Sequence, residues 1–379
     1  MNVTMNVSEA LNGSLGLLTS ASPVGGDDWS ASDVLDLSND NTLENFIEFQ
    51  IANGIDYYFS PVCSAVGILG NMWAFAILLT PSMRKSTTCQ YMAALAIADS
   101  LILVYNVLFL IRKFPGLDFF NPWTCKLLFF AFYYTIHFDV GVMMAMTIEK
   151  YLAVKFPLQA ASWKPRTKLV IGLIALACLV LDFHSLITRG MVVDPNTGVE
   201  GCLPTNPANK FFLFLVWPWI DAVVYCFIPL TTLFVLNILI IYTVKKSRKM
   251  RQQMMENPEN SAATNSRADT TKGSKENQIT RMLLLVSFAF LIFVGPMAII
   301  IIVERRFDLS STPHQAAIYH LARTIMNNLM YTNHSLNFLL YCLSAKRFRE
   351  KFIYLFDWVV GNKTQGNRLE NTSRTAMRV

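Results

Sequence analysis

The chain has 379 residues, of which 53% are hydrophobic and only 15% are charged, and its formal net charge is +6. An average soluble domain carries about 25% charged residues, so the charge here is too sparse to cover a soluble globule of this size. Seven cysteines are too few for a secreted disulfide-rich scaffold, and the high apolar content excludes a disordered chain. The apolar residues are gathered in blocks, which is typical of a membrane protein.

The blocks are long enough to cross a bilayer, since a helix that spans the hydrocarbon core needs about 20 mainly apolar residues. Backbone groups in lipid must be satisfied within the segment, and no block alternates like a strand of a membrane barrel, so each block is predicted to be helical. We therefore predict an all-α membrane protein, a seven-transmembrane helix bundle over residues 59–343. Its spans are 59–80, 89–111, 126–149, 168–187, 211–242, 281–303 and 318–343.

The basic residues predict the orientation of this bundle. Residues 1–58 contain no Lys or Arg but nine Asp or Glu, whereas 23 of the 32 basic residues lie in the first, third and fifth loops and in the C-terminal tail. Basic loops face the cytoplasm. We expect a multi-pass plasma-membrane protein with an extracellular N-terminal tail (1–58), a third cytoplasmic loop at 243–280 and a cytoplasmic C-terminus.

Three glycosylation sequons agree with an extracellular tail, because such acceptor sites are used in segments that reach the lumen. They begin at Asn2, Asn6 and Asn12. At the other end, residues 344–356 place Phe348, Phe352 and Phe356 on one helical face, with basic residues beside them. This pattern predicts a short amphipathic eighth helix at the lipid surface, followed by a disordered cytoplasmic tail at 357–379.

Polar motifs recur in a fixed order along the spans: Gly70-Asn71, Leu95-Ala-Ile-Ala-Asp99, Glu149-Lys150-Tyr151, Pro229, Pro296 and Asn337-Phe-Leu-Leu-Tyr341. With this set the chain resembles the rhodopsin-like (class A) G-protein-coupled receptors over residues 59–356. Phe338 stands where that family usually has Pro. In this variant the chain resembles several invertebrate neuropeptide receptors, including FMRFamide-type ones. The resemblance implies a heterotrimeric G protein and arrestin as partners. We find no internal repeat of the kind that transporters usually show, although a transporter or channel remains an alternative.

The resemblance also implies a disulfide. In that family a Cys opens the third span 25 residues before the central basic residue of the motif that ends it, and Cys125 precedes Lys150 by 25. Its usual partner lies in the second outer loop, where Cys202 is the only cysteine. We therefore expect a Cys125–Cys202 disulfide, formed in an oxidising lumen.

Asp99 is a charge within a predicted span, and such a charge is functional by default because it is expensive in lipid. In the resembled family this Asp binds a sodium ion together with Asn residues, and Asn71, Asn333 and Asn337 match those positions. Asp139 stands where the family usually has Ser. Two carboxylates facing one site are expected either to bind a cation or to share a proton. No other cofactor is expected.

The predicted cytoplasmic switch comprises Glu149, Lys150, Tyr151, Glu276, Pro296 and Tyr341. Lys150 replaces the family's Arg and loses the planar fork that pairs with a carboxylate in bidentate fashion. A Lys150–Glu276 pair is one interpretation, with Glu149 as a competitor; the other is a solvated pair that contributes little. The aromatic residue usually found two positions before the Pro of the sixth span is replaced by Val294. A decoy receptor that binds its ligand without signalling therefore remains an alternative.

Single positions set two ligand classes aside. Aminergic receptors carry Asp where this chain has Phe132, and opsins carry Lys where it has Tyr331. The candidate ligand-binding residues in the outer half are polar, aromatic and of both charges: Phe132, Tyr133, Asp221, Met297, Glu304, Arg323, Asn327 and Tyr331. Together with the acidic tail, which would attract a basic or amidated peptide, they favour a neuropeptide ligand. A chemosensory receptor remains an alternative.

Other function classes find no support in the sequence. No metal-ligand cluster, nucleophile elbow or phosphate-binding loop is present, so we do not expect an enzyme. The net positive charge is explained by the basic cytoplasmic face, so we do not expect nucleic-acid binding.

Overall fold

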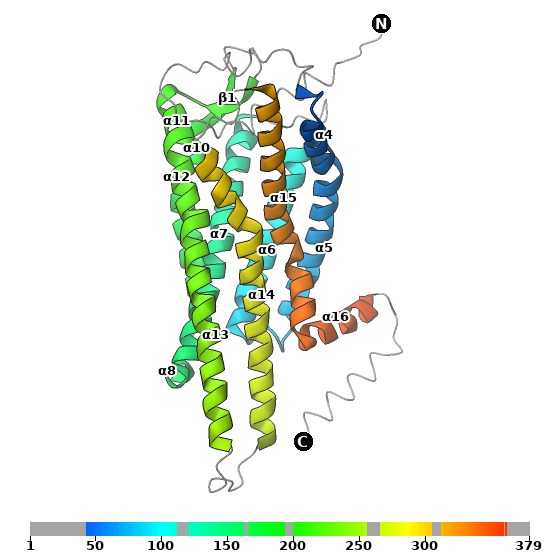
Figure 1. Cartoon of the computed structure of the whole chain (residues 1–379), viewed down its shortest axis with the longest axis vertical. Coiled ribbons are helices and arrows are strands. Elements are labelled where there is room, and N and C mark those ends of the chain that lie inside the picture. The colour runs from blue at the N-terminus through cyan, green and yellow to red at the C-terminus, as the bar shows by residue number, and fades with distance from the viewer. Residues whose placement is uncertain are drawn as a thin grey trace.

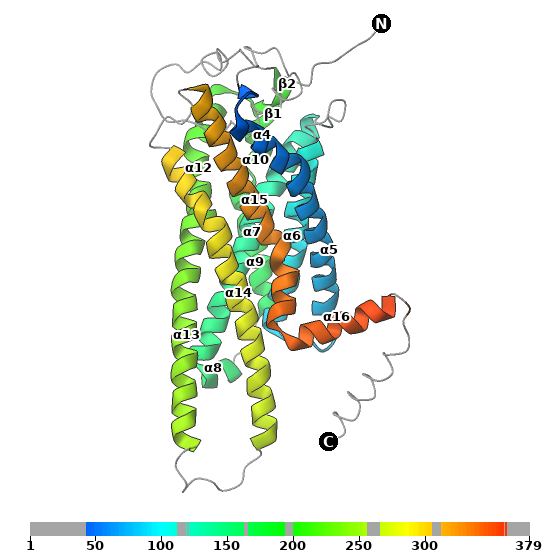
Figure 2. The same ribbon diagram turned by 45° about the vertical axis from the view of Figure 1, so that its right-hand side comes forward.

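The computed structural model describes residues 43–111, 119, 121–162, 166–193, 200–255, 266–304, 312–359 and 361. Over these residues, long helices run side by side along one axis, as Figure 1 shows. A two-stranded sheet lies at one end of the bundle, and α16 (Lys346–Val359) lies across the axis near the other end, which is plainest in Figure 2. The predicted helix bundle is confirmed.

The first helix is continuous from α4 (Ile47–Gly54) through a π-helical turn, η1 (Ile55–Phe59), into α5 (Ser60–Leu78). The fifth is built in the same way, from several joined segments. In chain order the remaining elements are α6 (Thr87–Ile111), α7 (Pro122–Lys155), α8 (Pro157–Ser162), α9 (Thr167–Asp182), α10 (Ser185–Thr188), β1 (Arg189–Val193), β2 (Glu200–Pro204), α11 (Pro207–Phe211), η2 (Phe212–Val216), α12 (Trp217–Asp221), η3 (Ala222–Phe227), α13 (Ile228–Met255), α14 (Ser266–Glu304) and α15 (Pro313–Ser344).

Six of the helical segments are long and apolar enough to cross a membrane. The seventh, α15, is 32 residues long but carries many polar residues. These polar residues are buried against other helices instead of facing lipid: Thr324, Asn328, Asn333, His334 and Asn337. Conversely, Val62, Val66 and Leu69 are exposed on one face of α5, where lipid would cover them. Mean hydropathy therefore underestimates how well α15 is suited to cross a membrane, because the polar face of this helix is turned to the bundle.

Helix boundaries differ from the hydropathy blocks mainly where polar residues continue a helix. The first helix begins at Ile47, whereas its apolar block begins at residue 59. Two acidic residues in this extension contact α15: Glu48 lies 3.2 Å from His314, and Asp56 accepts a hydrogen bond from Asn328 at 3.3 Å. At the end of the bundle opposite the sheet, α13 continues to Met255 and α14 begins at Ser266, so helix extends into the predicted third loop from both ends.

The outer end of α7 is fixed by a helix cap and a disulfide. Asn121 accepts hydrogen bonds from the backbone of Trp123 and Thr124, and Pro122 occupies the first turn, where its missing N–H costs nothing. Cys125, in this first turn, is joined to Cys202 of β2 with a Cα–Cα distance of 5.5 Å. β2 pairs with β1 in antiparallel register. The predicted disulfide is confirmed, and it holds the hairpin at the end of α7.

Candidate functional site

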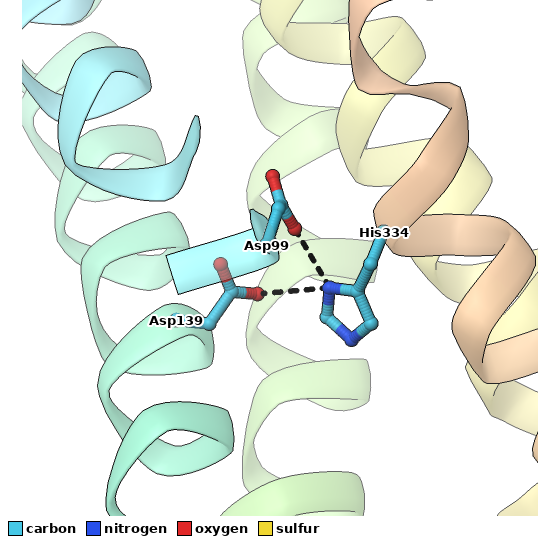
Figure 3. Close-up of side chains that lie close together, drawn as sticks. All are labelled: Asp99, Asp139 and His334. Carbon is cyan, nitrogen blue, oxygen red and sulfur yellow. Dashed lines mark hydrogen bonds and ion pairs between the residues drawn. The ribbon is translucent and has the colours of Figure 1, made fainter. Parts of the chain in front are cut away.

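Three buried ionisable side chains from three helices meet inside the bundle, as Figure 3 shows. Asp99 comes from α6, Asp139 from α7 and His334 from α15. The ring atom Nδ1 of His334 lies 2.7 Å from Oδ1 of Asp99 and 3.8 Å from Oδ2 of Asp139. We call these three residues the inner cluster. The predicted meeting of the two carboxylates is therefore present, with an unpredicted histidine between them.

Asparagines complete the inner cluster. Asn337 donates a hydrogen bond to Oδ2 of Asp99 at 2.6 Å, and Asn71 donates to the backbone carbonyl of His334 at 2.9 Å. Asn333 is buried as well, but the neighbouring His334 is the residue of this turn that contacts the carboxylates. His334 lies three residues before Asn337, on the same helical face. An ionisable residue in a span is a signal by itself, and it could have identified His334 from the sequence.

A second histidine, His137 of α7, lies between two carboxylates in the outer half of the bundle. Its Nδ1 is 2.9 Å from Oδ1 of Asp182 at the end of α9, and its Nε2 is 3.1 Å from Oδ1 of Asp221 at the end of α12. A neutral imidazole has only one N–H, so one ring nitrogen would face a carboxylate with its lone pair. The arrangement therefore favours the doubly protonated, positively charged ring. We call these three residues the outer cluster.

The outer cluster sits in an aromatic environment that fixes the ring of His137. Tyr133 stacks on it at 6.3 Å between ring centroids, and Trp217 and Tyr225 approach with their edges at 6.0 Å and 6.5 Å. The side chain of Asp182 is fully buried, whereas that of Asp221 is 23% exposed. Asp221 is thus the carboxylate of this cluster that an incoming molecule could reach. The sequence singled out Tyr133 and Asp221 but missed His137 as their partner.

The other predicted ligand residues lie on several helices of the outer half. Phe132 contacts Tyr105 and Phe109 edge to face, at 6.5 Å and 6.0 Å. Arg323 donates a hydrogen bond to the hydroxyl of Tyr319 at 2.8 Å. Met297, Asn327 and Tyr331 are half-buried, on α14 and α15. The side chain of Glu304 lies outside the described residues.

At the end of the bundle opposite the sheet, the residues of the predicted switch have specific contacts. The hydroxyl of Tyr91 donates a hydrogen bond to Oε2 of Glu149 at 3.0 Å, and Lys150 beside it is buried. Tyr151 lies beneath the ammonium group of Lys155, and the buried ring of Tyr341 packs against Phe348. The interpretation of Lys150 and Glu276 as a pair stays a prediction, because the side chain of Glu276 lies outside the described residues. Pro296 lies inside α14, as expected for a hinge.

The same end holds a contact between α14 and α15 that the sequence did not predict. Nε and Nη2 of Arg281 in α14 both donate hydrogen bonds to the backbone carbonyl of Ser344, the last residue of α15. From α16, Arg349 donates to the carbonyl of Cys342 at 2.7 Å. Last-turn carbonyls have no partner within their own helix, so arginines at this position satisfy them.

Comparison with known proteins agrees with this architecture. The family model for the 7 transmembrane receptor (rhodopsin family) matches residues 70–341. A probable G-protein coupled receptor of Caenorhabditis elegans is 22% identical over 337 residues, which are 85% of this chain and 74% of that protein. An FMRFamide receptor of Drosophila melanogaster is 24% identical over 347 residues, 85% of this chain and 56% of that protein. The matched region includes both histidine clusters and the disulfide, and the chain belongs to the rhodopsin family of seven-transmembrane, G-protein-coupled receptors.

Proposed function

We propose that this protein is a neuropeptide receptor of the plasma membrane that transmits peptide binding to a heterotrimeric G protein. The observation that carries the proposal is its similarity to a Drosophila protein named as an FMRFamide receptor, which extends over 85% of this chain. The charges in the outer half support a peptide, because an exposed edge of Asp221 and the guanidinium of Arg323 offer partners to both a basic and an acidic ligand group.

In this proposal the N-terminus is extracellular, an orientation that the distribution of Lys and Arg supports. The tail before residue 43 carries its glycans at Asn2, Asn6 and Asn12, which lie outside the described residues. The disulfide-linked hairpin of β1 and β2 is then on the outer surface, next to the outer cluster. The long cytoplasmic ends of α13 and α14 face the G protein and arrestin.

The mechanism requires only that the peptide bind one arrangement of the helices more tightly than the other. A peptide group at Asp221 contacts α12, which is continuous with α13, and changes the balance of charge around His137 of α7. Movement of the cytoplasmic half of α14 about Pro296 would open the G-protein site. Arg281 would have to release the carbonyl of Ser344 for α14 to move away from α15.

The proposal is tested by expressing the chain in cells and applying a library of amidated neuropeptides, with calcium and cAMP as readouts. We expect a concentration-dependent response to at least one peptide. Asp221→Asn should weaken that response about 10-fold or more, the usual effect of losing a charge-assisted contact. The matched acid Asp357→Asn, in α16 at the opposite end, should leave it unchanged. Silence of the correctly surface-expressed receptor in both readouts, and in arrestin recruitment, would contradict the proposal.

Three alternatives make different predictions. A chemosensory receptor of the same fold would respond to small molecules and not to the peptides. A decoy would bind a peptide without signalling, and Lys150→Arg would then restore G-protein activation. A transporter or channel would show solute flux or current without any G protein.

A further inference from the structure

The inner cluster is the place where receptors resembling this one hold a sodium ion, and the sequence left two states open there, a bound cation or a shared proton. We propose that the ring of His334 occupies the cation's position between Asp99 and Asp139, so that the receptor does not respond to sodium. The proposal concerns the receptor's ion dependence and holds whatever ligand the receptor binds.

Each oxygen of Asp99 already accepts a hydrogen bond. Oδ1 lies 2.7 Å from Nδ1 of His334, and Oδ2 accepts the amide of Asn337 at 2.6 Å. Hard cations prefer several oxygen ligands with free lone pairs. Here a nitrogen-bound proton points at each oxygen of the carboxylate that would have to hold the ion.

The ring of His334 also lies between the two acids. Nδ1 of His334 faces Asp99 at 2.7 Å and Asp139 at 3.8 Å, so it fills the place from which one cation could reach both carboxylates. Hydrogen bonding to a carboxylate requires a proton on Nδ1, and a singly protonated ring can present this N–H as well as a doubly protonated one. The hydrogen bond to Asp99 therefore forms whatever the total charge of the ring.

The surroundings of His334 hold its ring in place. His334 and Asn71 are fully buried, and Asn71 donates a hydrogen bond to the backbone carbonyl of His334. Nδ1 of His334 lies 3.8 Å from Oδ2 of Asp139, and neither oxygen of Asp139 has a hydrogen-bond donor among the described residues. Moving the ring aside to admit an ion would break its 2.7 Å hydrogen bond to Asp99 inside the bundle. A buried polar group that loses its hydrogen bond is costly, so the ring stays.

The test compares thermal unfolding of the purified receptor in sodium chloride and in choline chloride of equal ionic strength. The buried thiols of Cys89, Cys178 and Cys226 report unfolding through a thiol-reactive dye. We expect the same Tm in both salts for the wild type. His334→Ser removes the ring and supplies a hydroxyl oxygen, so its Tm should be about 3 °C higher in sodium than in choline when sodium is well above its Kd.

His320→Ser, which removes another histidine of the same helix, is the matched control and should show no difference between the salts. If His334→Ser does not fold, His334→Asn keeps a polar side chain of smaller size and is measured in its place. A saturable, sodium-specific rise in the Tm of the wild type that is lost in Asp99→Asn would overturn the proposal. So would a His334 variant that folds and gains no sodium dependence. Because no ligand is used, neither result depends on the peptide screen.

Discussion

The hydroxyl of Tyr91 in α6 donates a hydrogen bond to Glu149 in α7, with 3.0 Å between the oxygens. Glu149 precedes Lys150 in the motif that ends the third membrane helix. Here the acid has a partner on another helix. The contact therefore joins the N-terminal part of α6 to the C-terminal part of α7.

Tyr91→Phe removes this hydrogen bond and keeps the packing of the buried ring. We expect a loss of about 1 kcal/mol in the free energy of unfolding, the usual contribution of one such bond. A thermal melt should show a decrease in Tm of about 2–4 °C. An unchanged Tm would mean that water replaces the phenol at no cost.

His137→Ala should be among the most damaging single changes in the outer half. It leaves Asp182 and Asp221 without the ring that pairs with both, and unpairing a buried charge costs about 3–5 kcal/mol. We expect a large decrease in Tm and in surface expression. The control is His314→Ala, whose side chain is 54% exposed beside Glu48 and should change stability by less than about 1 kcal/mol. Equal effects of the two variants would contradict a pairing role for His137.

Arg281→Ala should raise basal G-protein activity, because it removes the hydrogen bonds that hold α14 to the end of α15. Hydrogen bonds from a charged donor contribute about 1.5–3 kcal/mol, so we expect roughly a 10-fold change in the balance between the two helix arrangements. Arg349→Ala removes a hydrogen bond to the same helix end from α16 and should leave basal activity unchanged. Basal signalling at matched surface expression is the measurement.

Replacing Cys125, Cys202 or both with Ser should destabilise the outer hairpin to the same extent in all three variants. The disulfide closes a loop between residues 77 apart, and loop entropy alone predicts about 4 kcal/mol for a loop of this size. We expect a lower Tm and poor surface expression in each case. A double variant clearly worse than either single variant would show that the cysteines act separately.

The sequence alone determined the features that depend on one segment at a time. Whether a segment spans the membrane is a question of its length and apolar content, so the bundle could be predicted, and the charges of the loops predicted its orientation. The Cys125–Cys202 bond and the proximity of Asp99 to Asp139 followed from positions shared with a family of known architecture, and both are present.

Which polar side chains meet across helices depends on how the helices pack against one another. His334 and His137 each lie between two carboxylates from other helices, and such meetings depend on how each helix is rotated about its axis. The π-helical turn η3 between Asp221 and Pro229 changes that rotation, because it holds an extra residue that a 3.6-residue period does not count. The helices could therefore be read from hydropathy, whereas the partners of their buried charges could not.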